Sequence, residues 1–185
     1  MRSSVLTTLA AVMTVLAQAP ASADTTSDMM AMGHAFAAVH SFHADITNGN
    51  GTMMSMDMIL PDKFHMTMNG KMQVIEIGND MWMNVNGQWQ HMPMAGSMMQ
   101  RPLAMARDAG MQGNGPSNYT ITDLGPAMLG TVPTHKYHMV GKSGDTVDMW
   151  LSHNLPLQVQ VTGKAGTETI KYSEYNSVPN ITPPA

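Results

Sequence analysis

The sequence of 185 residues predicts a mainly β protein of the α+β kind, in which an antiparallel meander of short strands follows an N-terminal helix. From Phe42 onward apolar and polar residues alternate. A period of two is typical of β-strands, because successive side chains point to opposite faces. Turn signals rich in Gly, Asn, Asp and Pro separate the alternating stretches, as in strands joined by hairpins. The length suits one domain with a core of its own.

Residues 1–23 have the pattern of a signal peptide. Arg2 gives a positive start, Val5–Leu16 is a short apolar run, and Ala21-Ser22-Ala23 resembles a cleavage site. The apolar run is too short to span a bilayer. We therefore expect residues 1–23 to be removed, residues 24–185 to form a single domain, and the mature protein to be periplasmic or secreted.

A helix is expected directly after this segment, because Met29, Met32 and Phe36 recur at helical spacing and Ser27 or Asp28 can cap the first turn. An extended stretch then begins at Phe42. Asn69-Gly70 is a strong signal for a hairpin turn, and Asn86-Gly87 is another. Further strands are expected over about 52–60, 64–69, 74–77, 81–85, 88–92, 118–124, 134–140, 145–151, 155–163 and 167–175.

The segment between the two groups of strands has a different pattern. Residues 95–109 have helix-compatible spacing and residues 110–116 are rich in glycine, which predicts a short helix followed by a mobile loop. A proline-rich tail beyond Pro179 is expected to be extended.

Composition excludes several classes of function. Cysteine is absent, so the chain has no disulfide, thiolate nucleophile or Cys-based metal site. Only 12% of residues are charged and the net charge is -4, which argues against a nucleic-acid partner. None of the motifs G-x-S-x-G, H-E-x-x-H, G-x-G-x-x-G or the P-loop occurs. Asp57 and Glu76 are expected to face water. The chain is therefore not expected to be an enzyme or to need a cofactor.

Methionine is the unusual feature, with 23 residues against 10 leucines. Within the predicted strands, alternation places thioethers on the face that would be buried. Met is flexible and polarizable, which suits a surface that adapts to varied apolar shapes. The candidate ligand-binding residues on this face are Met54, Met56, Met58, Phe64, Met66, Met68, Met81 and Met83.

Three other interpretations of the methionines stay open. They fill the core in place of Leu and Ile, or they bind a soft ion such as Cu(I) or Ag(I) in metal tolerance, or they act as an oxidant sink. Exposed Met98, Met99 and Met111 would favour the sink. The candidate metal ligands, expected to meet across a hairpin, are Met81, Met83, His91, Met92 and Met94.

Several segments share the pattern of a known family. They are "LPDKFHMTM", "VIEIGNDMWMNVNGQW", "ITDLGPAMLGTVPTHKYHMV" and "DMWLSHNLPLQVQV" with "IKYSEYN". In the same order, over about residues 36–183, they resemble the LolA and LolB superfamily of periplasmic lipoprotein carriers and the related mycobacterial lipid-binding lipoproteins. The resemblance implies an open, curved sheet, a half-barrel that encloses a few helices and shelters an acyl chain. It also implies an apolar ligand or lipoprotein as partner, and a membrane-associated acceptor. Oligomeric state is left open, and a methionine content above what the family needs leaves the cargo open.

Overall fold

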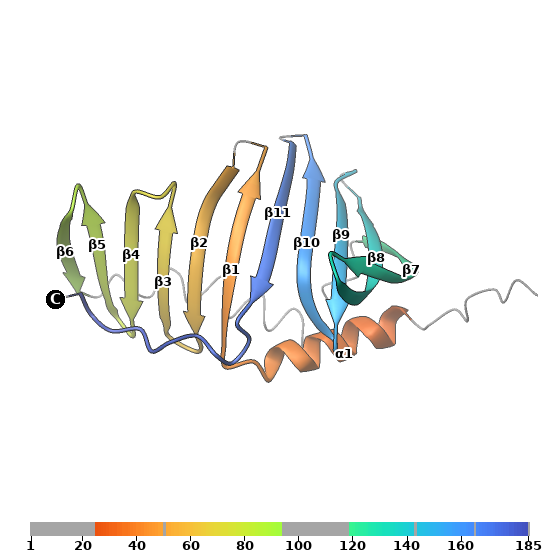
Figure 1. The fold of residues 1–185 in the computed structure, drawn as a ribbon, viewed down its shortest axis with the longest axis horizontal. Coiled ribbons are helices and arrows are strands. Elements are labelled where there is room, and N and C mark those ends of the chain that lie inside the picture. The colour runs from red at the N-terminus through yellow and green to blue at the C-terminus, as the bar shows by residue number, and fades with distance from the viewer. Residues whose placement is uncertain (1–24, 50, 94–118, 143, 165, 185) are drawn as a thin grey trace, which may run out of the picture.

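The computed structural model describes residues 25–49, 51–93, 119–142, 144–164 and 166–184 (Figure 1). In these ranges one helix and eleven strands form a mainly β fold, as predicted. The helix α1 spans Thr25–Ala37. The strands are β1 (Ser41–Asn48), β2 (Gly51–Ile59), β3 (Lys63–Met68), β4 (Met72–Ile77), β5 (Asp80–Val85), β6 (Gln88–Pro93), β7 (Tyr119–Leu129), β8 (Val132–Gly141), β9 (Thr146–Ser152), β10 (Leu155–Gly163) and β11 (Gly166–Ser173).

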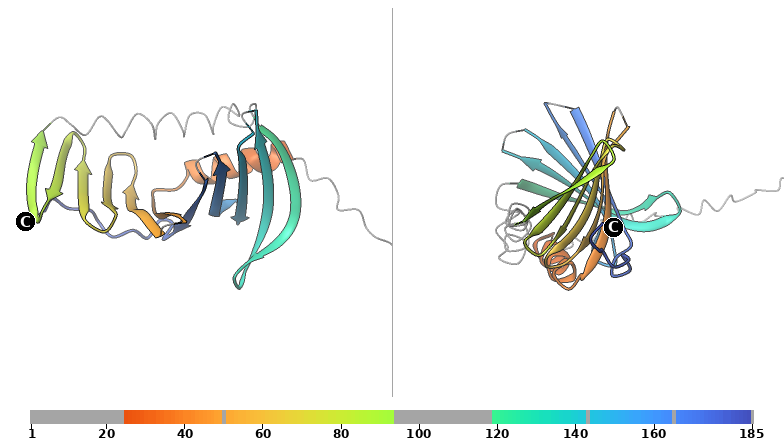
Figure 2. Two further views of the ribbon diagram at one scale, coloured as in Figure 1. Left: turned by 90° about the horizontal axis from the view of Figure 1, so that it is seen from above. Right: turned by 90° about the vertical axis from the view of Figure 1, so that its left-hand side faces the viewer.

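All eleven strands belong to one open antiparallel sheet with the order β6-β5-β4-β3-β2-β1-β11-β10-β9-β8-β7. Two meanders, β1 to β6 and β7 to β11, are joined where β1 pairs with β11. The sheet is strongly twisted along its length (Figure 2). β6 and β7 are therefore the two edge strands of the sheet in the part of the chain that the structure describes.

Asn-Gly pairs make two of the tight turns, as expected from the sequence. Asn69 and Gly70 between β3 and β4 have φ of 48° and 65°, and Asn86 and Gly87 between β5 and β6 have φ of 55° and 83°. Two consecutive residues with positive φ suit the right-handed twist of the strands they connect, and Asn and Gly reach that region at least cost.

The two faces of the sheet differ in chemistry. The inner face carries Phe42 and Ala44 of β1, and the outer face carries His43 and Asp45, because neighbours in a strand alternate. Register extends this division to the neighbouring strands: Phe42 lies opposite Met58, and His43 lies opposite Asp57.

Helix α1 covers the inner face over the second meander, where it contacts β10 and β7. Buried Met29 of the helix packs with Tyr137, Met149 and Leu151. A second cluster of buried residues centres on Val39, Phe42, Ala44, Met58, Phe64, Met66 and Val74. The core is thus divided between a helix-covered half and a half floored by β1 to β4.

The segment after β11 crosses the outer face near the ends of β1 and β3 (Figure 1). The backbone amides of Asn176 and Val178 donate hydrogen bonds to the carbonyl and the hydroxyl of Ser41, respectively. Lys63 Nζ donates to Asn180 Oδ1 at 3.0 Å, and Ile181 is buried. The expected extended tail is therefore docked onto the sheet.

Several expectations differ from the structure or lie outside it. Ser27 and Asp28 lie inside α1, which begins at Thr25, so neither caps its start. Strand β7 runs to Leu129 rather than to residue 124. A few helices were expected, and the described ranges hold one. Residues 1–23 and the predicted helix and loop of 95–116 lie outside the described residues. No helix in the described ranges is long and apolar enough to cross a bilayer.

Replacing Phe42 by Ala is expected to lower the free energy of unfolding by about 3–5 kcal/mol, because the ring is buried where β1 joins the two meanders. Chemical denaturation measures this change. Val140→Ala is the control: Val140 is 39% exposed, so its change should stay within about 0.5 kcal/mol. Equal losses in both variants would contradict the placement of the core.

Candidate functional site

Methionines of β2, β3 and β5 gather on the inner face because the register of four strands agrees. Met56 lies opposite Met66, which lies opposite Val74. Val74 lies opposite Met83. The Met-rich face consists of the inner-face side chains Met54, Met56, Met58, Phe64, Met66, Met68, Val74, Met81 and Met83. All eight residues singled out from the sequence as ligand-binding therefore share one surface, together with Val74.

Burial varies across this surface. Met58, Phe64, Met66 and Val74 are buried and form its floor. Met54, Met56, Met68, Met81 and Met83 are only partly buried and pack against that floor. Thioether chains that are partly accessible keep rotamer freedom, so this surface can change shape at low cost.

Four aromatic rings close the Met-rich face on the side of the second meander. Phe36 of α1 lies 5.5 Å from Phe42, and Phe42 lies 5.9 Å from Tyr172, between ring centroids. Tyr175 stacks 6.5 Å from Tyr172, and its hydroxyl donates to the carbonyl of Pro156. Burial raises the pKa of both tyrosines above the usual range, so both hydroxyls stay neutral. The cluster forms an apolar boundary of packed rings.

Glu76 is the polar exception on the inner face, and the expectation that it faces water is wrong. Its Cα lies opposite those of Phe64 and Met81, and its side chain is 1% exposed. In β4 three consecutive residues, Val74 to Glu76, are buried. Both faces of the strand are covered at this point, so the alternation of apolar and polar residues did not indicate which side chain is exposed to solvent. Asp57, by contrast, lies on the outer face and is partly exposed, as expected.

The candidate metal ligands do not come together as expected. Met81 lies opposite Met92 on the inner face, but His91 lies opposite Trp82 and therefore projects from the outer face. There His91 stacks on Trp82 and its Nε2 lies 2.9 Å from Asp80 Oδ1. Adjacent residues in a strand point apart, so His91 cannot share an ion with Met81, Met83 and Met92. Met94, like Met98, Met99 and Met111 of the oxidant-sink interpretation, lies outside the described residues.

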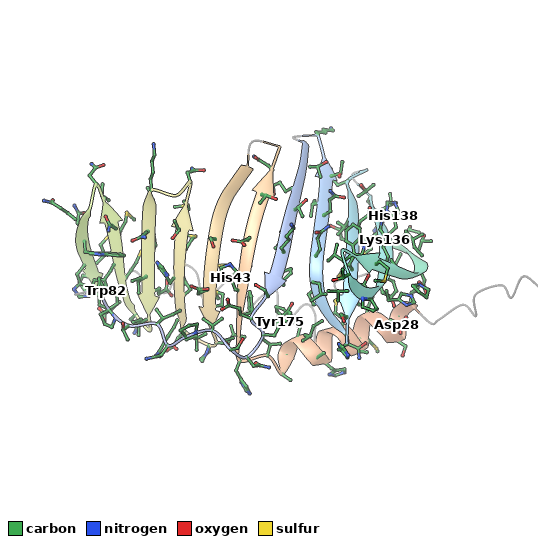
Figure 3. The ribbon with its side chains drawn as sticks, in the orientation of Figure 1. Asp28, His43, Trp82, Lys136, His138 and Tyr175 are labelled. Atoms are coloured by element: carbon green, nitrogen blue, oxygen red, sulfur yellow. The ribbon has the colours of Figure 1, made fainter. Side chains whose placement is uncertain are left out.

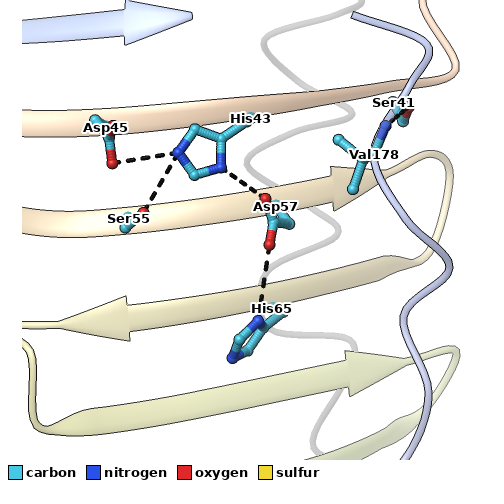
Figure 4. Close-up of polar contacts among 7 residues, drawn as sticks. All are labelled: Ser41, His43, Asp45, Ser55, Asp57, His65 and Val178. Carbon is cyan, nitrogen blue, oxygen red and sulfur yellow. Dashed lines mark hydrogen bonds and ion pairs between the residues drawn. The ribbon is translucent and has the colours of Figure 1, made fainter. Parts of the chain in front are cut away.

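A His–Asp network that the sequence analysis did not identify lies on the outer face of β1 to β3 (Figure 4). His43 Nδ1 lies 2.6 Å from Asp57 Oδ1, and His43 Nε2 lies 3.3 Å from Asp45 Oδ1 and 3.4 Å from the Ser55 hydroxyl. His65 Nδ1 lies 3.8 Å from the other oxygen of Asp57. The alternating polar residues in "HAD" (43–45) and "SMD" (55–57) were the available signal.

Ser55, His43 and Asp57 have the order of contacts found in a nucleophile–base–carboxylate triad, but their electrostatics oppose that role. Asp45 occupies the nitrogen that would have to accept the serine proton. Burial lowers the pKa of His43, yet the hydrogen bond to Asp57 and the charge of Asp45 raise it by more, so the net shift is upward. The upward shift of the pKa favours the protonated imidazole between the two carboxylates, and this opposes a role as a general base.

A second charged group lies on the outer face of β8 and β9 (Figure 3). His138 Nδ1 and Lys136 Nζ lie 2.6 and 3.2 Å from the two oxygens of Asp148. Burial raises the pKa of Asp148, but these two hydrogen bonds outweigh it and lower the pKa. Lys136 also lies 4.5 Å from the centroid of the Trp150 ring. These contacts make both groups ion-pair networks. No three His, Asp or Glu side chains in the described ranges are arranged to hold a metal ion.

The raised pKa of His43 predicts a pH-dependent stability. A pKa that is higher in the folded protein stabilises it fully below the unfolded value of 6.5, and the stabilisation is lost as pH rises through the folded pKa. Wild type should therefore exceed His43→Gln in free energy of unfolding at pH 5.5, by a margin that shrinks toward pH 9. Urea denaturation across this range measures it, with His153→Gln in an exposed turn as control. A margin that grows with pH would refute the upward shift of the His43 pKa.

The fold matches two solved structures over most of the chain. LprF from Mycobacterium bovis is 14% identical, with a TM-score of 0.65 over 86% of this chain and 96% of that one. The lipoprotein LppX from Mycobacterium tuberculosis is 11% identical, with a TM-score of 0.64 over 86% of this chain and 100% of that one. No family model and no curated protein sequence matches the chain. The resemblance to mycobacterial lipoproteins is thus confirmed at the level of the fold, which is the fold of LprF and LppX.

Proposed function

We propose that this chain is an exported, non-catalytic carrier that holds an apolar ligand, such as the acyl chain of a lipid or lipoprotein, against the Met-rich face. The observation that supports the proposal is the register of β2 to β5, in which seven methionines share one face with Phe64 and Val74. Five of these methionines are only partly buried. The resemblance seen in the sequence, which implies a carrier of acyl chains, supports the same function.

Burial of apolar surface supplies the affinity in this proposal. Each Å² of apolar surface removed from water contributes about 25 cal/mol, so an acyl chain laid along the partly buried methionines gains several kcal/mol. Flexible thioethers let the floor accept chains of different length and branching. The aromatic cluster of Phe36, Phe42, Tyr172 and Tyr175 sets one end of the ligand site.

Replacing Met56, Met68 and Met83 together by Gln is expected to weaken binding of a fluorescent acyl probe by at least about tenfold, because amide groups on the Met-rich face resist burial beneath the probe. Replacing the same three residues by Leu keeps the surface apolar and should leave probe affinity within about threefold of wild type. Met30→Gln, at a helix position 46% exposed, is the matched control.

The Leu variant also separates the carrier from the soft-metal alternative. Leucine has no sulfur, so Cu(I) affinity, measured by competition with a chromogenic chelator, should fall in the Leu variant if the thioethers are ligands. If the Leu variant keeps its affinity for Cu(I) but no longer binds the acyl probe, the proposed role of the Met-rich face is contradicted.

Native mass spectrometry of protein isolated from the periplasm tests the proposal as a whole. Protein that begins at Asp24 and carries a co-purified lipid is the expected result. Protein recovered only from the cytoplasm with Met1 retained would contradict export. If protein from the periplasm carries no lipid and binds no acyl probe on titration, the carrier function is contradicted. The methionines would then only fill the core.

A further inference from the structure

The β7–β8 hairpin continues past the rest of the sheet as a free two-stranded arm. β8 pairs with β9 only through His135–Val140, whereas its pairing with β7 continues to Val132. Among the strands of the described ranges, residues 126–134 therefore have no neighbour beyond the hairpin itself. Both views of Figure 2 show this hairpin, in teal, extending away from the other strands. We call residues 126–134 the β7–β8 arm.

The surface of the arm and its base is apolar and uncharged. Leu124 at the base is 51% exposed, Met128 is 60% exposed and Val132 is 41% exposed. Residues 124–134, "LGPAMLGTVPT", contain no acidic, basic or histidine side chain. Met128 lies opposite Pro133 and Val132 lies opposite Leu129, so Met128 and Val132 project from opposite faces of the arm, which is therefore apolar on both sides. Large exposed apolar groups without charge typically mark an interaction surface.

The arm is a poor template for another β-strand. Pro126 lies on β7 and Pro133 on β8, so each strand of the arm lacks one backbone N–H donor. Prolines at an edge are a known device against edge-to-edge pairing. A second copy that adds a strand here would lose hydrogen bonds, and a charged protein partner would find no complementary side chain.

We propose that the β7–β8 arm docks in the interfacial layer of a lipid bilayer with zwitterionic head groups. The tip of the arm would enter the boundary between head groups and acyl chains, where interfacial segments bury their apolar side chains, with exposed Met128 on one face and Val132 on the other. The net charge of -4 disfavours an anionic surface and matches a neutral one. Insertion is shallow, because the open edges of the two strands cannot enter hydrocarbon without losing hydration.

This docking site is separate from the Met-rich face. β7 is at one edge of the sheet, and β2 to β5 lie toward the other. Docking through the arm therefore leaves the Met-rich face unblocked. The inference adds a membrane surface as a partner and does not depend on the ligand proposed above.

Flotation with phosphatidylcholine vesicles tests the inference on the chain 24–185. Wild type is expected to float with the vesicles. Met128→Asp or Val132→Asp should lower the partition coefficient by at least about tenfold, since a charge replaces an apolar side chain that enters the bilayer. Val85→Asp, at a 37% exposed position of β5, should float like wild type.

Met128→Trp provides a second test, because an indole in the interfacial layer should strengthen flotation and shift its fluorescence to the blue on vesicle addition. The inference is overturned if wild type does not float with the vesicles. It is also overturned if the Asp variants float as well as wild type. So would flotation that requires anionic lipid and disappears in high salt. Binding of the acyl probe is measured in parallel, and Asp variants that keep it but no longer float separate this inference from the proposed function.

Discussion

The antiparallel register of β1 with β2 on one side and β11 on the other is the constraint on which the rest of the molecule depends. β1 is the strand that joins the two meanders. A slip of one residue would turn Phe42 and Ala44 outward and bring His43 and Asp45 inward. Because every other strand takes its register from a neighbour, the position of β1 decides which side chains form the core on both halves of the sheet.

The two halves of the inner face use different kinds of packing. Over the second meander, α1 buries Met29 against Tyr137 and Met149, and this half has a helix-covered core. Over the first, buried Met66 and its neighbours form a floor whose upper methionines are only partly covered. Branched residues and rings specify one packing, whereas unbranched thioethers permit several. The apolar surface that can change its packing is therefore concentrated over β2 to β5.

The charged groups of the outer face help to decide which face of the sheet is buried. His43 lies between Asp45 and Asp57, and Asp148 lies between His138 and Lys136. These groups are partly exposed, so each pair adds little stability by itself. Burial of the same charges in an inverted sheet would cost several kcal/mol per ion. The polar pattern thus acts together with the methionines to decide which face turns inward.

The sequence by itself determined the mainly β fold, the hairpins at Asn69-Gly70 and Asn86-Gly87, and the shared face of the methionines, because alternation and turn chemistry are local properties. Only the tertiary structure decided that Glu76 is buried, that His91 and Met81 lie on opposite faces, and that His43 lies between two carboxylates. Those outcomes depend on which strand lies beside which and in what register. That pairing joins residues far apart in the chain, and local periodicity contains no information about it.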